Sequence, residues 1–138
     1  MTPEAMALLH HASFRMPRPW NAVEFRELLA SPRVFAFRVG ERALLIGQVV
    51  ADEAELLTLA VDPGFRRQGL GRRLVRQFLV EARGRGATSA FLEVAATNLG
   101  AMALYEACGF AETGRRRGYY RGPERAVDAV LMGCGLHI

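Results

Sequence analysis

At 138 residues, with 51% hydrophobic and 23% charged residues, the chain has the composition of a globular protein and the length of one domain, residues 1–138, with a sizeable core. No apolar run reaches the roughly 18 residues that a membrane span needs, and the N-terminus lacks the basic-then-apolar pattern of a secretion signal. We therefore expect a cytoplasmic protein without a membrane partner, in which Cys108 and Cys134 are buried free thiols.

The net charge is +4, and all 18 basic residues are arginine. A pI near 9.8 suits RNA, the ribosome or an anionic cofactor, and charge alone does not choose among them. We expect no DNA partner, no metal, and a monomer or weak dimer. His10 and His11 are adjacent, so their rings point to different faces and cannot form an i, i+4 metal pair; we expect them at the surface or at a helix end.

The N-terminal part predicts two helices followed by three strands. The first helix runs from Pro3 to Phe14, and the second runs from its N-cap, Asn21, to Leu29. Prolines between them forbid a continuous helix. The strands are expected as an antiparallel meander over 34–39, 44–50 and 56–61.

The stretch from Leu56 to Glu81 carries the most specific pattern, which is strand, basic glycine-containing loop, amphipathic helix. Gly69 and Gly71 let the backbone come close to a ligand. The first turn of the helix then offers free N–H groups and the positive end of its dipole, with arginines around it. This arrangement suits a pyrophosphate.

Two better-known phosphate loops are excluded. A Walker loop needs a lysine, and the chain has none. A dinucleotide-binding loop needs a third glycine where Leu74 stands, and an acidic residue about 20 positions further on in a second βα unit. The pattern that remains is R-x-x-G-x-G over Arg66–Gly71, and its alternative is an exposed turn with solvated arginines.

The C-terminal part completes a sheet. A strand over Ser89–Val94 follows the central helix, so it should lie parallel to the strand before that helix. Asn98 is the expected N-cap of a short helix that Gly109 ends. Two antiparallel strands, over 110–117 and 126–132, close the chain, and a loop over 118–125 connects them.

These segments together resemble the GCN5-related N-acetyltransferases (GNAT), and within them the RimI branch, which acetylates protein N-termini. The resemblance covers the C-terminal part of the chain and is weak over the N-terminal helices. The segments that carry it are Leu56–Val61, Arg66–Arg73, Phe91–Val94, Asn98, Ala103–Phe110, Arg116–Tyr120 and Asp128–Met132.

The resemblance implies the fold class and the cofactor. The fold would be a single α/β (α+β) domain with a mixed, mostly antiparallel, splayed sheet flanked by helices. The cosubstrate would be acetyl-CoA, with its pyrophosphate on the arginine loop and its pantetheine arm between the parted strands. The implied cofactor-binding residues are Leu59, Ala60, Val61, Arg66, Arg67, Gln68, Gly69, Leu70, Gly71, Arg72, Arg73 and Asn98.

Acetyl transfer to an amine needs a base, an oxyanion stabiliser and support for the leaving thiolate. Glu93 interrupts an apolar strand, where partial desolvation makes a carboxylate a better proton acceptor; a glutamate at a frayed, solvated strand end is the alternative. Tyr105 lies on the apolar face of the short helix, and spacing alone is equally consistent with a core tyrosine. The resemblance implies that Glu93 is the base and Tyr105 the acid of a direct transfer in a ternary complex.

The resemblance also implies the acceptor, the N-terminal alanine of a small-subunit ribosomal protein. The residues expected to contact it are Trp20, Arg117, Tyr119 and Tyr120, although Trp20 equally fits a core position.

The role of the basic segment and the function of the chain each have alternatives. The arginine-tyrosine run over 115–121 also suits a nucleic-acid patch or a solvated loop, and Gly118 stands where the family usually has asparagine. A GNAT enzyme acting on a small-molecule amine or a lysine side chain is one alternative function. A non-catalytic, basic RNA-binding module is the other.

Overall fold

The computed structural model describes residues 1–13, 19–66, 68–121 and 125–136. The elements in chain order are α1 (Pro3–Ser13), α2 (Ala22–Leu29), β1 (Val34–Val39), β2 (Ala43–Val50), β3 (Glu53–Val61), the 3-10 turn η1 (Pro63–Phe65), α3 (Leu70–Gly84), β4 (Ser89–Ala95), α4 (Leu99–Ala107), β5 (Ala111–Arg121) and β6 (Ala126–Gly135). None of the helices in these ranges is long and apolar enough to span a bilayer.

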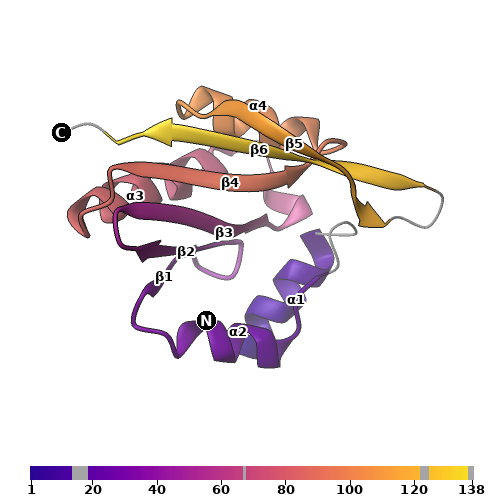
Figure 1. The fold of residues 1–138 in the computed structure, drawn as a ribbon. Coiled ribbons are helices and arrows are strands. Elements are labelled where there is room, and N and C mark those ends of the chain that lie inside the picture. Colours follow the sequence, from indigo (N-terminus) through magenta and orange to yellow (C-terminus); the bar gives the residue numbers. More distant parts are fainter. Residues whose placement is uncertain (14–18, 67, 122–124, 137–138) are drawn as a thin grey trace.

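The six strands form one mixed sheet in the order β1-β2-β3-β4-β6-β5 (Figure 1). Neighbouring strands are antiparallel except β3 and β4, which are parallel and are connected through α3. The predicted fold class, a mixed and mostly antiparallel sheet flanked by helices, is therefore confirmed.

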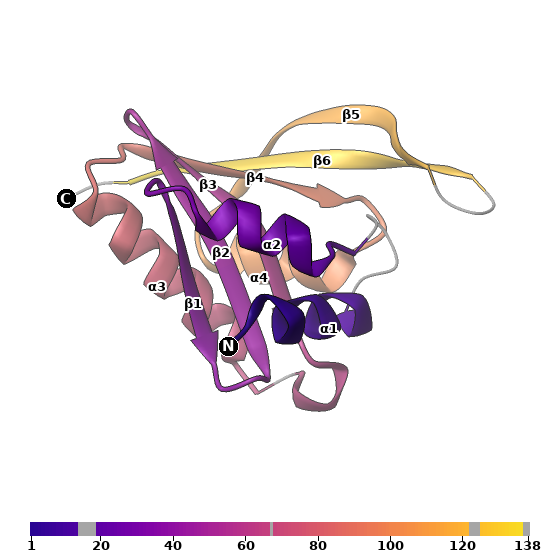
Figure 2. The ribbon, with the colours of Figure 1, turned by 90° about the horizontal axis from the view of Figure 1, so that it is seen from below.

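Helices cover both faces of the β1–β3 part of the sheet (Figure 2). On one face α3 packs through Leu74 and Phe78, both fully buried. Gly47 of β2 allows this close approach, because an added Cβ would meet the Phe78 ring at 2.7 Å. On the other face α1 and α2 enclose a second apolar cluster around Phe25, which is also fully buried.

A β-bulge in β3 changes the face that its side chains occupy. Thr58 pairs with Ile46 of β2, whereas Leu56 pairs with the very next residue of β2, so Leu57 is the extra residue of the bulge. Leu56 belongs to the core under α3, and Leu57 packs in the α1–α2 cluster. Strict alternation would place Thr58 with Leu56. The bulge instead turns Thr58 toward α1, where it meets His10.

β3 and β4 run side by side for only a short distance. Their register extends over Glu53–Glu55 opposite Ser89–Phe91, although β3 continues to Val61 and β4 to Ala95. On their other edges the two strands stay paired, with β2 and β6 respectively. The two halves of the sheet therefore diverge beyond Glu55 and Phe91 (Figure 2).

The local signals predicted at helix ends are confirmed. Asn21 Oδ1 accepts a hydrogen bond from the Glu24 N–H at 2.9 Å, and the Glu24 side chain completes a capping box. Gly86, with φ +94°, and Gly109, with φ +100°, take the left-handed conformation just after α3 and α4.

The loop expected over 118–125 is wrong in its first part. β5 continues to Arg121, with a register shift against β6 after Arg116. Gly118 has φ +60°, and its N–H donates to Asp128 Oδ1 at 2.9 Å. Here the glycine forms a bulge inside a strand instead of ending it, a distinction that composition alone does not make.

Candidate active site

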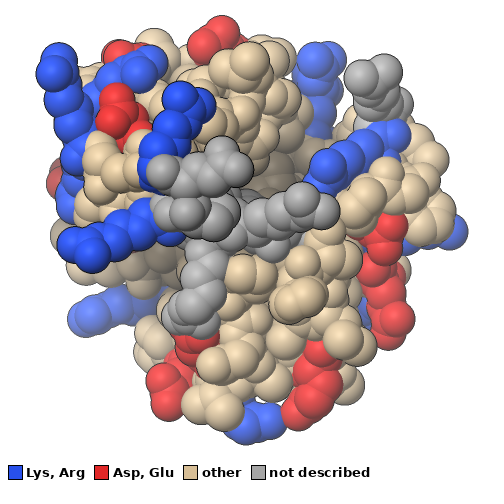
Figure 3. All heavy atoms as spheres, turned by 90° about the vertical axis from the view of Figure 1, so that its right-hand side faces the viewer, with Lys and Arg blue, Asp and Glu red and all other residues tan. Residues whose placement is uncertain are grey.

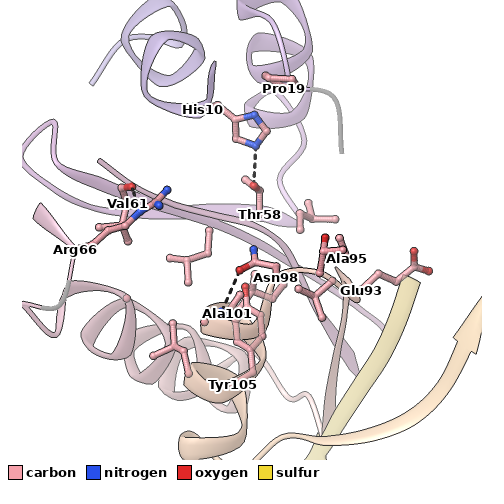
Figure 4. A pocket seen from close by; sticks show the side chains of 18 of the residues that line it. His10, Pro19, Thr58, Val61, Arg66, Glu93, Ala95, Asn98, Ala101 and Tyr105 are labelled. Atoms are coloured by element: carbon pink, nitrogen blue, oxygen red, sulfur yellow. Dashed lines mark hydrogen bonds between the residues drawn. The ribbon is translucent and has the colours of Figure 1, made fainter. Parts of the chain in front are cut away.

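A groove of about 1930 Å³ follows the opening between β3 and β4. Its walls come from α1, the residues before α2, β3, the start of α3, β4, α4 and β5. Figure 4 places Arg66 and Glu93 at opposite ends of this groove, with Thr58, Asn98 and Tyr105 between them. The topology thus collects residues that are far apart in sequence along one surface.

The predicted anion-binding loop forms one end. Gly69 is the N-cap of α3 with φ +76°, and it has no side chain to satisfy the first N–H groups of the helix. Arg72 is exposed at the groove wall. Arg66 Nε donates to the Val61 carbonyl at 3.4 Å, which bends this arginine back over the end of β3 (Figure 4). A helix N-terminus flanked by cations favours a bound phosphate group.

Glycine at position 71 allows two helices to approach closely. An added Cβ there would meet Leu104 Cδ2 of α4 at 2.8 Å. Leu59 and Leu70 line the groove beside it. Gly71 therefore lets α4 close one wall against the first turn of α3.

Four other residues predicted for cofactor binding do not line the groove or are not described. Ala60 is 1% exposed and packs in the α1–α2 cluster. Gln68 and Arg73 are exposed but lie outside the groove lining. Arg67 lies outside the described residues.

Glu93 projects from β4 into the other end of the groove. Its neighbours Leu92 and Val94 fill the core, so Glu93 takes the opposite face of the strand. The side chain is 26% exposed, and its Oε1 lies 3.3 Å from Arg116 Nη2 of β5. The sequence suggested a lone carboxylate among apolar residues. In the structure the carboxylate instead has a guanidinium partner. An ammonium group entering the groove would compete with Arg116 for it.

Tyr105 and Asn98 stand at the α4 side (Figure 4). Tyr105 is 6% exposed, and burial raises the pKa of its phenol, with Cys108 adding to the rise. The phenol is therefore protonated at neutral pH. Asn98 Oδ1 accepts from the Ala101 N–H at 3.2 Å, which confirms its N-cap role, and the residue also lines the groove.

Aromatic residues of β5 surround the Glu93 end. Tyr119 and Tyr120 both line the groove, and their ring centroids are 5.2 Å apart. The Arg116 guanidinium lies 5.2 Å from the Tyr119 ring centroid. Burial raises the pKa of Tyr120, and Glu93 and Tyr119 add to the rise while Arg116 opposes it. Arg117, which was predicted here, is exposed and outside the lining.

His10 is the groove residue that the sequence analysis missed. We expected it at the surface or at a helix end, yet it is 1% exposed and lines the groove. Its Nε2 lies 2.8 Å from Thr58 Oγ1, and its Nδ1 accepts from the Trp20 N–H at 2.8 Å. Trp20 lines the groove and also packs against the α1–α2 cluster.

Charged side chains of both signs line the opening, namely Arg66, Arg72 and Arg116 with Glu55 and Glu93. On the face toward which β3 and β4 point, arginine side chains stand on either side of a central hollow (Figure 3). Among the described residues, no group of three or more His, Cys, Asp or Glu side chains is placed to hold a metal ion. Parted strands with a cationic helix N-terminus at one end, and a carboxylate and a phenol farther along, are the arrangement expected of a CoA-dependent acyltransferase.

Comparisons with known proteins agree with this class. The model of the acetyltransferase (GNAT) family matches residues 6–110. The [ribosomal protein bS18]-alanine N-acetyltransferase of Escherichia coli K12 is 43% identical over 115 residues, covering 74% of this chain and 78% of the relative. The N-alpha-acetyltransferase RimI of Mycobacterium tuberculosis is 39% identical over 122 residues, covering 83% of this chain and 74% of the relative. The crystal structure of the ribosomal-protein-S18-alanine N-acetyltransferase from Escherichia coli superposes with a TM-score of 0.87 at 35% identity, over 99% of this chain and 88% of that one.

The chain therefore belongs to the acetyltransferase (GNAT) family. It is an acetyl-CoA-dependent N-acetyltransferase, and the alternative of a non-catalytic RNA-binding module is set aside.

Arg72→Gln tests the assignment of the anion-binding end. Removing one charge beside the first turn of α3 is expected to weaken CoA binding about tenfold, the size of one charge-assisted hydrogen bond. Titration calorimetry measures this affinity, and the loss should shrink at high salt. Arg33→Gln, an exposed arginine outside the groove, is the matched control. Equal CoA affinity in both variants would place the phosphates elsewhere.

Proposed function

We propose that this enzyme transfers the acetyl group of acetyl-CoA to the α-amine of a protein N-terminus, and that its acceptor is the N-terminal alanine of a small-subunit ribosomal protein. The observation that carries the proposal is the continuous groove, which has the phosphate-binding features at one end and Glu93 with the β5 tyrosines at the other. The 43% identity to a bS18-alanine N-acetyltransferase supports this acceptor.

The open, aromatic acceptor end favours a peptide over a compact polycation. Trp20 and Tyr120 both line the groove, and the Arg116 guanidinium of β5 lies 5.2 Å from the centroid of the neighbouring Tyr119 ring. A polyamine or an aminoglycoside would need several carboxylates, whereas Glu93 here already pairs with a guanidinium. A peptide presents only one cationic amine, which matches the single carboxylate that we assign as base.

Glu93 is proposed to remove a proton from the incoming α-ammonium, directly or through a water molecule. An α-amine has an ordinary pKa near 8, so at neutral pH it is mainly protonated. A base therefore needs to shift its protonation equilibrium only modestly toward the free amine. The free amine then attacks the thioester carbonyl carbon, the C–N bond forms, and the tetrahedral intermediate collapses as the C–S bond breaks. One amine proton goes to solvent through Glu93, and the second goes to the released thiol.

Tyr105 is proposed to donate its phenolic hydrogen to the departing sulfur. Burial raises the pKa of this phenol, so a persistent phenolate is unfavourable. The phenol therefore first stabilises the developing thiolate through a hydrogen bond. It then gives its proton to the sulfur, and the amine nitrogen of the tetrahedral intermediate returns a proton to Tyr105. The free inner edge of β3 near Leu59 supplies backbone N–H groups that suit the pantetheine amides and the oxyanion.

The acceptor is tested by incubating the enzyme with acetyl-CoA and peptides, and by measuring acetylation with mass spectrometry. A hexapeptide that begins with alanine should be acetylated once, at its α-amine. The same peptide with a blocked N-terminus and an internal lysine should remain unmodified. Acetylation of the lysine peptide or of small amines alone would remove the N-terminal acceptor while leaving the acetyltransferase intact.

Glu93→Gln tests the proposed base. Turnover is expected to fall by about 10² to 10⁴ at neutral pH, and less at alkaline pH where the amine is already free. Acetyl-CoA affinity should not change, because Arg66 and Glu93 lie at opposite ends of the groove (Figure 4).

Arg116→Gln is the matched control for Glu93→Gln, because it breaks the same ion pair and keeps the carboxylate. Steady-state kinetics should separate the two variants by a large ratio of kcat. If both lose the same activity, the ion pair and not proton transfer accounts for the effect.

A further inference from the structure

The buried histidine of α1 has no part in the mechanism above, although it forms one wall of the same groove. His10 is 1% exposed, and its ring is stacked on Trp20 with centroids 5.1 Å apart and meets Phe25 edge-on at 5.5 Å. Among the described residues, one hydrogen bond joins the ring to β3 and another joins it to the backbone just before α2. His10 thus links α1 to β3 and to the residues just before α2.

The tautomer of His10 follows from its partners. A backbone N–H can only donate, so Nδ1 must present its lone pair to the Trp20 N–H at 2.8 Å. The proton of the neutral ring is then on Nε2, which donates to Thr58 Oγ1 at 2.8 Å. A second proton on Nδ1 would face the Trp20 N–H, and two donors would oppose each other. Only the neutral imidazole makes both bonds.

The partner on β3 is available because of the bulge at Leu57. Without this extra residue, Thr58 would face the α3 core with Leu56. The bulge occurs where β3 has parted from β4, so it lies on the strand that forms the groove floor. His10 therefore ties the position of Trp20 to the strand along which the cosubstrate is proposed to bind.

We propose that His10 is a positioning residue for the acceptor side of the groove, where its neutral ring fixes Trp20 against the bulged strand, and that acidification releases Trp20. The inference rests on the proposed function of the groove, because Trp20 is assigned to the acceptor wall. The other ionisable side chains of α1, α2 and β3 are Glu4, His11, Glu24, Arg26, Glu27, Glu53 and Glu55.

Two substitutions separate the two bonds of the ring. In His10→Asn, the amide oxygen takes the place of Nδ1 and can accept from Trp20, but the side chain is too short to reach Thr58. In His10→Gln, the amide reaches the place of Nε2 and Thr58, and the Trp20 N–H loses its acceptor. Neither amide titrates between about pH 5 and pH 8, the range in which an imidazole gains its proton.

Trp20 is the only tryptophan in the chain, so its fluorescence reports its position whatever the acceptor is. Between about pH 8 and pH 5, the wild-type emission should shift to longer wavelength as Trp20 becomes more exposed. His10→Asn should keep the wild-type emission of about pH 8 across this range. His10→Gln should show the shifted emission throughout. The same titration of His11→Gln, which changes the exposed neighbour, should match wild type.

Kinetics with the alanine peptide give the functional arm. At about pH 7.5, His10→Gln should raise KM for the peptide about tenfold, the effect of one lost buried hydrogen bond, and leave KM for acetyl-CoA unchanged. On acidification the peptide KM of the wild type should rise relative to the peptide KM of His10→Asn. Protonation of the peptide amine affects both values equally, so it cancels in their ratio.

The proposal is overturned if His10→Asn titrates like wild type, or if His10→Gln matches wild type in emission and peptide KM. It is also overturned if His10→Gln alters the two KM values equally. Circular dichroism melting verifies that each variant is folded, and the wild-type emission titration decides the matter even if a variant is not. An absence of peptide acetylation at every pH would contradict the proposed acceptor alone, since the fluorescence arm needs no acceptor.

Discussion

The structure depends on the early end of pairing between β3 and β4. A strand edge carries N–H and C=O groups that need partners, and leaving one buried and unpaired costs about 1–3 kcal/mol. Here the two edges remain open beyond Glu55 and Phe91 because their outer neighbours, β2 and β6, hold them apart. An extended chain with its own amides can satisfy such edges, which is the shape and chemistry of a pantetheine arm. The helix that connects β3 to β4 necessarily begins at the open end, so its N-terminus and its arginines lie where the anionic part of the cosubstrate would be.

The bulge in β3 gives the same strand a second task. It transfers Thr58 from the α3 face to the α1–α2 face, and so connects the N-terminal helices to the groove floor. The proposed acceptor wall consists of parts that are far apart in sequence, namely α1, the residues before α2, β4 and β5. Glu93 and Arg116 meet across β6. Glu93 and Gly114 are both opposite Leu131, and Arg116 is two residues beyond Gly114 on β5. Under the proposed function, acceptor binding and cosubstrate binding would share β3 but use different neighbours of this strand.

The sequence predicted what is encoded locally. Asn21 and Asn98 cap helices because a short polar side chain precedes an apolar period, and Gly109 ends one because glycine tolerates a positive φ. The strand, loop and helix around Gly69 follow from changes of hydrophobic period.

What the sequence left out depends on partners that are distant in the chain. The ion pair of Glu93 with Arg116 joins two strands that are not neighbours in the sheet, so the sequence of β4 does not indicate it. The burial of His10 depends on Thr58, 48 residues away, and on a bulge that reverses the side-chain alternation. Gly118 is compatible with a strand end or with a bulge, because glycine permits both, and only the pairing of β5 with β6 decides between them.

Hydrogen exchange of the backbone amides, with and without CoA, tests the central claim most directly. If the cosubstrate binds along the parted strands, CoA should slow exchange over residues 57–61 of β3 and over 68–73 at the start of α3, and leave β1 unaffected. Slowed exchange that is confined to other segments, with unchanged rates over 57–61, would contradict the account.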